Sequence, residues 1–254
     1  MQMTARTLAA TNGVSPEHQS PHQDSPSEHP TPQERADADH GAADTARENG
    51  ADNDRTPGDK TCSEDPVDIA TGEFLLPETD VELPGVLALA LRRTHRSNYR
   101  YGRWFGPSWS ATLDMRLVVE HEGVTFLGED GIMLAYPHAE VGIATEPVTG
   151  GQQWTLTRTE VGGYRIWDQQ REILWHFAPE PALDSIESRL GNYAISAITD
   201  RHRNRIRFHY DTNGVPTEVS HSGGYRVRID TTAGRVTRLS LIGVDPDGAE
   251  SAPD

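Results

Sequence analysis

Residues 204–214 read NRIRFHYDTNG and predict a β-strand that ends in a tight turn. Apolar Ile206, Phe208 and Tyr210 alternate with Arg and His, so one face of the strand is apolar and the other is wet. Residues 211–214 then supply turn chemistry, because Asp and Asn side chains bond nearby amides and glycine accepts a positive φ. This stretch therefore predicts half of a β-hairpin.

The pattern returns about one hairpin later. Alternation resumes in residues 225–230, YRVRID, and the turn that follows ends at Gly234. Asp211 and Asp230 are 19 residues apart, and Gly214 and Gly234 are 20 apart. A strand–turn unit at a fixed period predicts an array of hairpins that grows by stacking. The residues that we take to define the repeat are Tyr210, Asp211, Gly214, Asp230 and Gly234.

Short strands separated by turn residues also fill most of the chain before this array. Residues 113–136 read as a meander with hairpin turns at 122–123 and 129–131, and residues 154–177 read as three more strands. A short strand at 74–76 is expected to end at Pro77. Because no stretch shows sustained helical periodicity, we predict an all-β fold, an antiparallel β-hairpin meander behind a disordered N-terminal arm.

Composition divides the chain into four segments. Residues 1–64 are rich in Pro, Ser, Asp and Glu and hold almost no large apolar side chains, so they are expected to form a disordered acidic arm. We assign residues 65–158 to an N-terminal β domain and residues 159–243 to the first hairpin repeats. Residues 244–254 read as a flexible tail.

Charge and cysteine content exclude several classes of protein. The 254 residues carry a formal net charge of −16, which is the opposite of a nucleic-acid footprint and is repelled by an anionic membrane surface. The single cysteine, Cys62, excludes a disulfide framework within the chain. The sequence shows neither a membrane-spanning run nor a signal peptide. We expect synthesis in the cytoplasm, with secretion by a specialised system left open.

No constellation of residues indicates catalysis or metal binding. The histidines in or beside the hairpin array are His176, His202, His209 and His221, and a metal site would need several of them to converge. We therefore predict no catalytic residue, no cofactor and no metal site, and we do not expect an enzyme. A hydrolase that uses His202, His209 and His221 is kept as a separate hypothesis.

An aromatic loop lies between two of the expected strands. Its aromatic residues are Tyr99, Tyr101, Trp104, Phe105 and Trp109, and Gly and Pro punctuate it. Such a cluster usually plugs one end of a β-core, because large rings bury much apolar surface. The alternative is a carbohydrate- or cell-wall-binding module that uses this loop as its interaction surface.

Three blocks of the chain carry a family resemblance: DPVDIATGEFLLPETDVELPG at 65–85, LRRTHRSNYRYGRWFGPSW at 91–109 and AITDRHRNRIRFHYDTNG at 197–214. In this order they resemble the N-terminal region of bacterial RHS (YD-repeat) polymorphic-toxin proteins. The resemblance implies that the hairpins form a YD-repeat sheet, part of a β-cocoon. In the family this hollow shell encloses a C-terminal toxin, which is released after self-cleavage at a downstream core domain. Such shells serve competition between bacteria.

The sequence departs from the family pattern in three places. Ile229 stands where the second repeat would have Tyr, and Arg203 stands where glycine is usual, so that turn is expected to differ. The sequence ends at Asp254 before any core or toxin domain, which indicates a truncated or split shell. We therefore expect a non-catalytic structural segment of a toxin-encapsulating shell. Its expected partners are the remainder of such a shell or a second copy, bound through an open sheet edge, with no nucleic acid and no membrane insertion.

Overall fold

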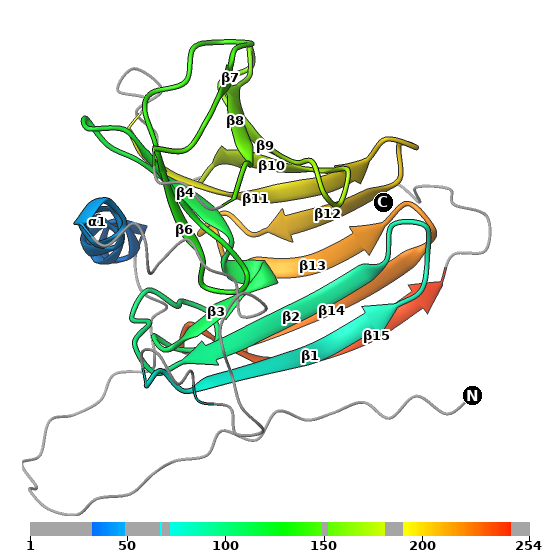
Figure 1. Ribbon diagram of the computed structural model, residues 1–254. Coiled ribbons are helices and arrows are strands. Elements are labelled where there is room, and N and C mark those ends of the chain that lie inside the picture. Colours follow the sequence, from blue (N-terminus) through cyan, green and yellow to red (C-terminus); the bar gives the residue numbers. More distant parts are fainter. Residues whose placement is uncertain (1–31, 49–66, 68–71, 149–151, 181–189, 245–254) are drawn as a thin grey trace, which may run out of the picture.

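The computed structural model describes residues 32–48, 67, 72–148, 152–180 and 190–244 (Figure 1). In this part of the chain, fifteen strands build two antiparallel sheets, and one α-helix lies beside them. The all-β fold class is therefore confirmed. No helix in these ranges is both long enough and apolar enough to cross a membrane.

The smaller sheet has three strands in the order β1-β2-β3, with bounds Leu75–Leu83, Leu89–Arg96 and Trp109–Ala111. The expected end of the first strand at Pro77 is wrong, because β1 continues for six residues beyond it. Pro77 faces Thr94 of β2, and β1 lies at the edge of the sheet. An edge strand tolerates proline, since an amide that points away from the sheet has no ladder partner to lose.

The larger sheet has twelve strands, and nine of them follow one path from β15 through β14, β13 and so on to β7. Strands β4, β5 and β6 branch from this path, because β4 pairs with β11. The bounds along the chain are β4 Arg116–Val119, β5 Val124–Leu127, β6 Met133–Tyr136, β7 Ala144–Thr145, β8 Thr155–Arg158, β9 Tyr164–Asp168, β10 Ile173–Pro179, β11 Gly191–Asp200, β12 Arg205–Tyr210, β13 Pro216–His221, β14 Tyr225–Thr232 and β15 Arg235–Val244.

The sheet divides at β11. The first residues of β11, from Gly191 to Ala194, pair with β4, whereas Ala197 to Thr199 pair with β12. The β4–β6 limb and the β12–β15 limb therefore diverge from one strand, as the ribbon shows (Figure 1). A 3₁₀ turn, η2 at Thr112–Asp114, leads from β3 into the β4–β6 limb. The predicted domain boundary between residues 158 and 159 falls in the turn between β8 and β9, two paired strands of this one sheet.

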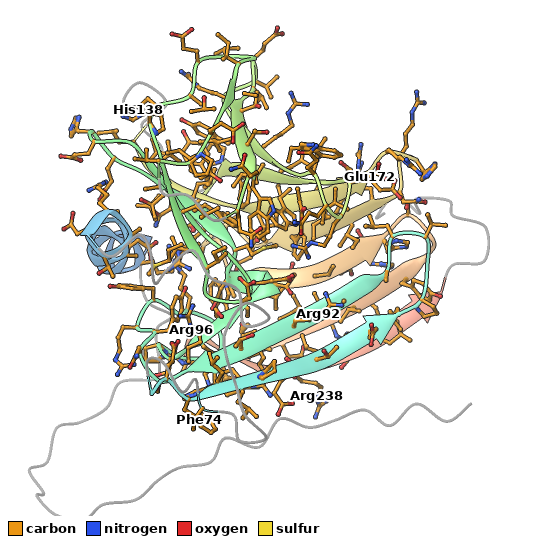
Figure 2. All side chains as sticks on the ribbon, viewed as in Figure 1. Phe74, Arg92, Arg96, His138, Glu172 and Arg238 are labelled. Atoms are coloured by element: carbon orange, nitrogen blue, oxygen red, sulfur yellow. The ribbon has the colours of Figure 1, made fainter. Side chains whose placement is uncertain are left out.

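Side chains fill the space between the β4–β6 limb and strands β8 to β10 (Figure 2). The ring of Phe126 stacks on Trp175 with centroids 5.6 Å apart, and Trp154 meets Trp175 edge-on at 4.8 Å. Phe177 closes the cluster, with its centroid 5.8 Å from that of Phe126. These large rings bury much apolar surface and form the centre of the core in this part of the molecule.

The smaller sheet covers the β13–β15 part of the larger one. Strands β1 and β2 lie over β14 and β15 (Figure 1), and their residues Leu83, Leu89 and Leu91 belong to the same buried cluster as Val219 and Val227. The His221 ring bonds through Nε2 to the Leu87 carbonyl at 2.8 Å, and the Val236 amide donates to the Trp104 carbonyl at 2.8 Å. One face of the hairpin array is therefore covered at this end.

The helix α1, Pro32–Glu48, lies inside the segment that the sequence predicted to be a disordered arm. Ala42, Ala43 and Ala46 are completely buried, and α1 packs on β4, β5 and β6. Pro at the first helical position and the many alanines favour this helix. The structure therefore differs from the expected disorder over these 17 residues, because small side chains allow close packing without large apolar residues. The other residues of 1–64, with Cys62, lie outside the described residues.

Candidate functional site

The turn after β12 is built by the Asp211 side chain. Its Oδ1 accepts the amides of Asn213 at 2.8 Å and Val215 at 2.9 Å, and Gly214 sits at φ 73°. The Gly214 amide donates to the Asp211 carbonyl at 3.0 Å. Aspartate thus satisfies the donors that the tight turn leaves without a ladder partner.

An identical arrangement occurs eleven residues earlier in the chain. Asp200 Oδ1 accepts the amides of His202 at 2.8 Å and Asn204 at 2.9 Å, at the same offsets as in the Asp211 turn. Arg203 adopts φ 68°, so this turn does not differ as expected from the missing glycine. The Asn204 amide group also donates to Asp200 Oδ2 at 2.7 Å, which adds a bond that the Asp211 turn lacks. The repeat therefore extends one turn further towards the N-terminus than the sequence pattern indicated.

Tyr210 ties its turn to the neighbouring strand. Its hydroxyl donates to the Ile195 carbonyl of β11 at 2.6 Å, and burial raises the pKa of the phenol. The second unit is built differently. Asp230 lies inside β14 and its carboxylate is 44% exposed, while Ala233 and Gly234 form a two-residue turn with φ of 50° and 69°. Two consecutive positive φ values match the hairpin turn that follows the natural twist of paired strands.

The aromatic loop does not present its rings as one surface. Tyr99 and Trp104 are buried at 4% and 3% exposure, whereas Tyr101, Phe105 and Trp109 are half-buried. The Arg93 guanidinium covers the Trp109 ring at 4.5 Å from its centroid. Most of the aromatic area is therefore used in packing, as in the plug interpretation.

A buried carboxylate that the sequence analysis missed holds this loop in place. Asp114 accepts the backbone amides of Arg103 and Trp104, each at 3.0 Å. Burial raises the pKa of Asp114, although Arg116 and the two amides oppose that shift. A lone Asp in an apolar meander carries no periodic signal, so only the folded chain reveals its role.

Buried charges fasten α1 to the sheet. Asp39 Oδ1 accepts from Nε and Nη2 of Arg116 at 3.1 and 2.7 Å, and its Oδ2 accepts from Arg103 and from Asn192. Arg116 is 1% exposed and also donates to the carbonyls of Asp114 and Tyr101. Arg103 reaches Glu180 at 2.5 Å. This group (Asp39, Arg103, Arg116, Glu180 and Asn192) is called the α1 ion cluster below.

Burial alone raises the pKa of Asp39, but the charges and hydrogen bonds of Arg116 and Arg103 outweigh it and leave the pKa below its ordinary value. Desolvation likewise lowers the pKa of Arg116, and Asp39 more than reverses that effect. Both groups therefore stay charged because they are paired. Such mutual satisfaction indicates a structural cluster rather than a reactive one.

The candidate histidines do not converge. His221 bonds the Leu87 carbonyl, His176 bonds Thr199 and His209 bonds Ser220, each at 2.8 Å. His202 lies in the exposed Asp200 turn. No group of three or more His, Cys, Asp or Glu side chains in the described part of the chain is arranged to hold a metal ion.

Both ends of the path from β15 to β7 expose apolar side chains. At one end, β15 pairs only with β14 among the described strands, and Leu241 and Ile242 are 44% and 40% exposed. At the other end, the two-residue β7 pairs with β8, and Ile143 beside it is 53% exposed. An unpaired edge offers backbone donors and acceptors to another strand.

Comparison with known proteins agrees with the family resemblance. Residues 64–136, which include all of β1 to β6, match the family described as "Domain of unknown function (DUF6531)". The chain is 32% identical over 171 residues to "Probable deoxyribonuclease RhsA" of Dickeya dadantii (strain 3937), which covers 65% of this chain and 11% of that protein. It is 26% identical over 188 residues to "Double-stranded DNA deaminase toxin A" of Burkholderia cenocepacia (strain H111), which covers 71% of this chain and 12% of that protein.

The chain thus spans about a ninth of the length of the curated relatives it matches. Among solved structures, it is similar to the N-terminal domain of the effector protein SpvB from Salmonella typhimurium strain LT2, with 15% identity and a TM-score of 0.37. That overlay covers 65% of this chain and 71% of the other, and at this TM-score it carries no argument.

Proposed function

We propose that this chain, which belongs to the RHS (YD-repeat) family, is a non-catalytic wall segment of a shell that encloses a toxin. The observation that carries the proposal is the larger sheet, which grows hairpin by hairpin to β15, a strand that pairs with no described strand other than β14. A twisted sheet that keeps adding hairpins can enclose a volume and hide its own edges.

The covered end of the sheet supports a closing role for this segment. Strands β1 to β3 and the aromatic loop fill the face of β13 to β15, so this part of the sheet has no room for a cargo. Hairpins added beyond β15 would continue the wall without that cover. We therefore place the segment at a closed end of the proposed shell.

The use of the buried charges supports a non-catalytic role. Arg96 is paired with Glu73 at 2.9 Å and donates to the Gly131 carbonyl at 2.6 Å, and Arg116 is paired with Asp39. These groups bridge segments that are far apart in the sequence, and each is held by several bonds. A catalytic acid or base must gain or lose a proton during the reaction, and pairing that fixes the charge of a group opposes this exchange.

The relatives named for action on DNA are about nine times longer than the matched region. Their deaminase and deoxyribonuclease names describe those whole proteins, and the formal net charge of −16 on this chain opposes contact with the DNA backbone. We therefore do not transfer these activities to this segment, and we do not use them to identify the enclosed toxin. We propose only the enclosing function.

The test is self-association through the β15 edge. We expect the full chain to form larger species as its concentration rises, measured by size-exclusion chromatography with light scattering, because an exposed strand edge recruits another strand. Replacing Leu241 and Ile242 by lysine should leave a monomer, since charged side chains on an edge strand oppose pairing.

The matched control is Val161→Lys, because Val161 is 94% exposed in the β8–β9 turn, far from β15 in the strand order. This variant should associate as the unmodified chain does. A chain that stays monomeric at every concentration would contradict the proposal. Equal association of the double lysine variant would contradict the assignment to the β15 edge.

A further inference from the structure

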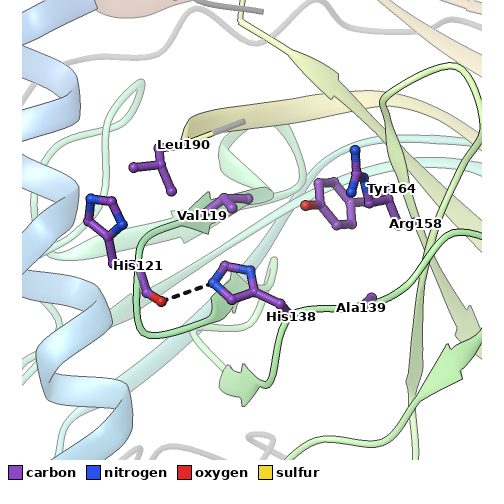
Figure 3. Close-up of a pocket in the computed structure, with 7 residues that line it drawn as sticks. All are labelled: Val119, His121, His138, Ala139, Arg158, Tyr164 and Leu190. Carbon is purple, nitrogen blue, oxygen red and sulfur yellow. Dashed lines mark hydrogen bonds between the residues drawn. The ribbon is translucent and has the colours of Figure 1, made fainter. Parts of the chain in front are cut away.

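A pocket of about 250 Å³ opens where the β4–β6 limb faces strands β8 and β9 (Figure 3). Five separate segments supply its walls: the ends of β4 and β6, the end of β8, the start of β9 and the residue before β11. The residues that line it are Val119, His121, His138, Ala139, Arg158, Tyr164 and Leu190. It lies at the mouth between two packed layers, which is a common position for ligand sites.

The floor of the pocket is apolar and rigid. Val119, Ala139 and Tyr164 are 2%, 6% and 4% exposed, and all three belong to the main buried cluster. The Tyr164 ring is itself held edge-on by Tyr193 at 5.0 Å. Because these side chains are packed from behind, the buried core holds the floor of the cavity in place.

The polar side chains that line the pocket are basic or uncharged. They are the Arg158 guanidinium, the imidazoles of His121 and His138 and the Tyr164 phenol, with no carboxylate among them. This selection is unexpected for a chain with 39 acidic and 23 basic residues. Among the described residues no carboxylate pairs with Arg158, so its charge is available to a ligand.

One hydrogen bond orients the rim. The His138 Nε2 lies 3.1 Å from the His121 carbonyl, as the dashed line shows (Figure 3). Because a carbonyl only accepts, Nε2 must carry the proton. The other ring nitrogen, Nδ1, is then left to accept a bond in the neutral ring or to donate one when the ring is protonated.

We propose that this pocket binds a small organic anion, in which one carboxylate or phosphate group is attached to a compact apolar or aromatic body. The guanidinium of Arg158 matches the planar oxygens of such a group, and the apolar floor receives the body. The cavity is smaller than the pockets that hold drug-sized ligands, which limits the body to about one ring. The site is distant from β15 in the strand order and is independent of the proposed wall function.

The experiment is isothermal titration calorimetry on the full chain with four probes: benzoate, phenyl phosphate, neutral benzamide and inorganic phosphate. We expect one saturable site for benzoate or phenyl phosphate, and the stronger of the two identifies the preferred acid group. Benzamide should bind at least roughly tenfold more weakly, because it lacks the charge that Arg158 recognises. Inorganic phosphate should also bind more weakly than phenyl phosphate, because it lacks the apolar body.

Two variants and one control separate this site from binding elsewhere. Arg158→Gln should weaken the anion by roughly tenfold or more, and His138→Gln should weaken it less. Arg238→Gln is the matched control, because Arg238 is exposed on β15 at the opposite end of the molecule (Figure 2). Circular dichroism should show the same fold for all three variants, and His138→Gln keeps the test open if Arg158→Gln folds poorly.

Three results would overturn the proposal. One is the absence of binding by both aromatic anions, and another is equal binding of benzamide. The third is unchanged affinity in Arg158→Gln and His138→Gln, which would place the bound anion elsewhere on the chain. Equal affinity for inorganic and phenyl phosphate would refute the apolar subsite.

Discussion

Helix α1, which packs on the larger sheet, and the β12–β13 hairpin, which is part of that sheet, are stabilised by different kinds of interaction. The buried apolar side chains described in the helix are alanines, and its buried polar side chains are the charged Arg35 and Asp39, of which Asp39 belongs to the α1 ion cluster. The hairpin buries Ile206 and Phe208 on one face and leaves its arginines in water. Its turn is closed by Asp211, and Arg35 of α1 adds one bond to the Asn213 carbonyl at 2.5 Å.

The difference shows two ways to specify a structure. An alternating strand gains stability from apolar area, and each residue adds a little without depending on one partner. A buried ion gains nothing unless every partner is present, because the cost of removing it from water is large. Docking of α1 is therefore expected to fail sharply when one member is lost, whereas the hairpin should weaken gradually.

The largest expected effect is that of Arg116→Met. The substitution keeps much of the length of a side chain that is 1% exposed, but it removes the charge that pairs with Asp39. It also leaves the carbonyls of Asp114 and Tyr101 without this donor. We expect the free energy of unfolding to fall by about 3–5 kcal/mol, measured by urea denaturation.

The matched control is Arg226→Gln in the hairpin array. Arg226 forms a two-bond pair with Glu218 at 2.9 and 2.8 Å, but its side chain is 53% exposed. Because water replaces such a pair readily, the loss should be about 0.2–1 kcal/mol. Similar losses for the two arginines would remove the contrast between the helix and the hairpins.

The second prediction concerns pH and Asp39→Asn. The folded pKa of Asp39 lies below 3.8, so its pairing stabilises the protein fully above the ordinary pKa and loses that effect as the pH falls through the folded pKa. We expect Asp39→Asn to cost about 1.5–3 kcal/mol near neutral pH. In urea titrations over a pH series, the difference from the unmodified chain should stay constant down to about pH 4 and shrink below it.

Asp44→Asn is the control on the same helix, because the Asp44 side chain is 72% exposed and its ion pair within the described part of the chain is with Arg47. It should change stability by less than about 0.5 kcal/mol at every pH. A difference for Asp39→Asn that disappears already at neutral pH would mean that the carboxylate is not ionised in the folded chain. An equal cost for both aspartates would mean that α1 is not docked through its buried charge.

The hairpin half of this fold could be predicted from the sequence because its signals are local. Period-two alternation in residues 205–210 and turn residues at 211–214 depend on neighbours in the chain. The turn at 129–131 was predicted in the same way, and the Gly131 amide closes it on the Gly128 carbonyl at 3.2 Å. The aromatic loop was also predicted to pack inward, and Tyr99 and Trp104 do so.

The features that sequence reasoning missed depend on distant partners. Asp39 and Asn192 meet at 2.7 Å across 153 residues, and neither lies in a motif. The pocket lined by His121, His138 and Arg158 likewise combines residues from separate strands and turns. Alanines that fit against a sheet resemble those of a disordered arm in composition, so α1 could not be distinguished from one by counting apolar residues.

The smallest expected effect tests whether the Asp200 and Asp211 turns are one device. Gly214 and Arg203 occupy matching positions with φ of 73° and 68°, a region that costs an L-residue about 1–2 kcal/mol. Gly214→Ala should therefore lower the free energy of unfolding by about 1 kcal/mol or slightly more in urea denaturation. Arg203→Gly should raise it by up to about 1 kcal/mol, because it removes strain but adds entropy to the unfolded chain.

The two substitutions have opposite expected signs because the backbone is the same and only the side chain differs. If Arg203→Gly is destabilising, the Arg203 side chain contributes more to its turn than the strained backbone costs. The Asp200 turn would then be a separate structure rather than an earlier copy of the Asp211 turn. Opposite signs of similar size would show that the aspartate builds the turn at both places, and that glycine only removes strain. The Asp-centred turn, and not the Tyr-Asp pair alone, would then define the repeat in this chain.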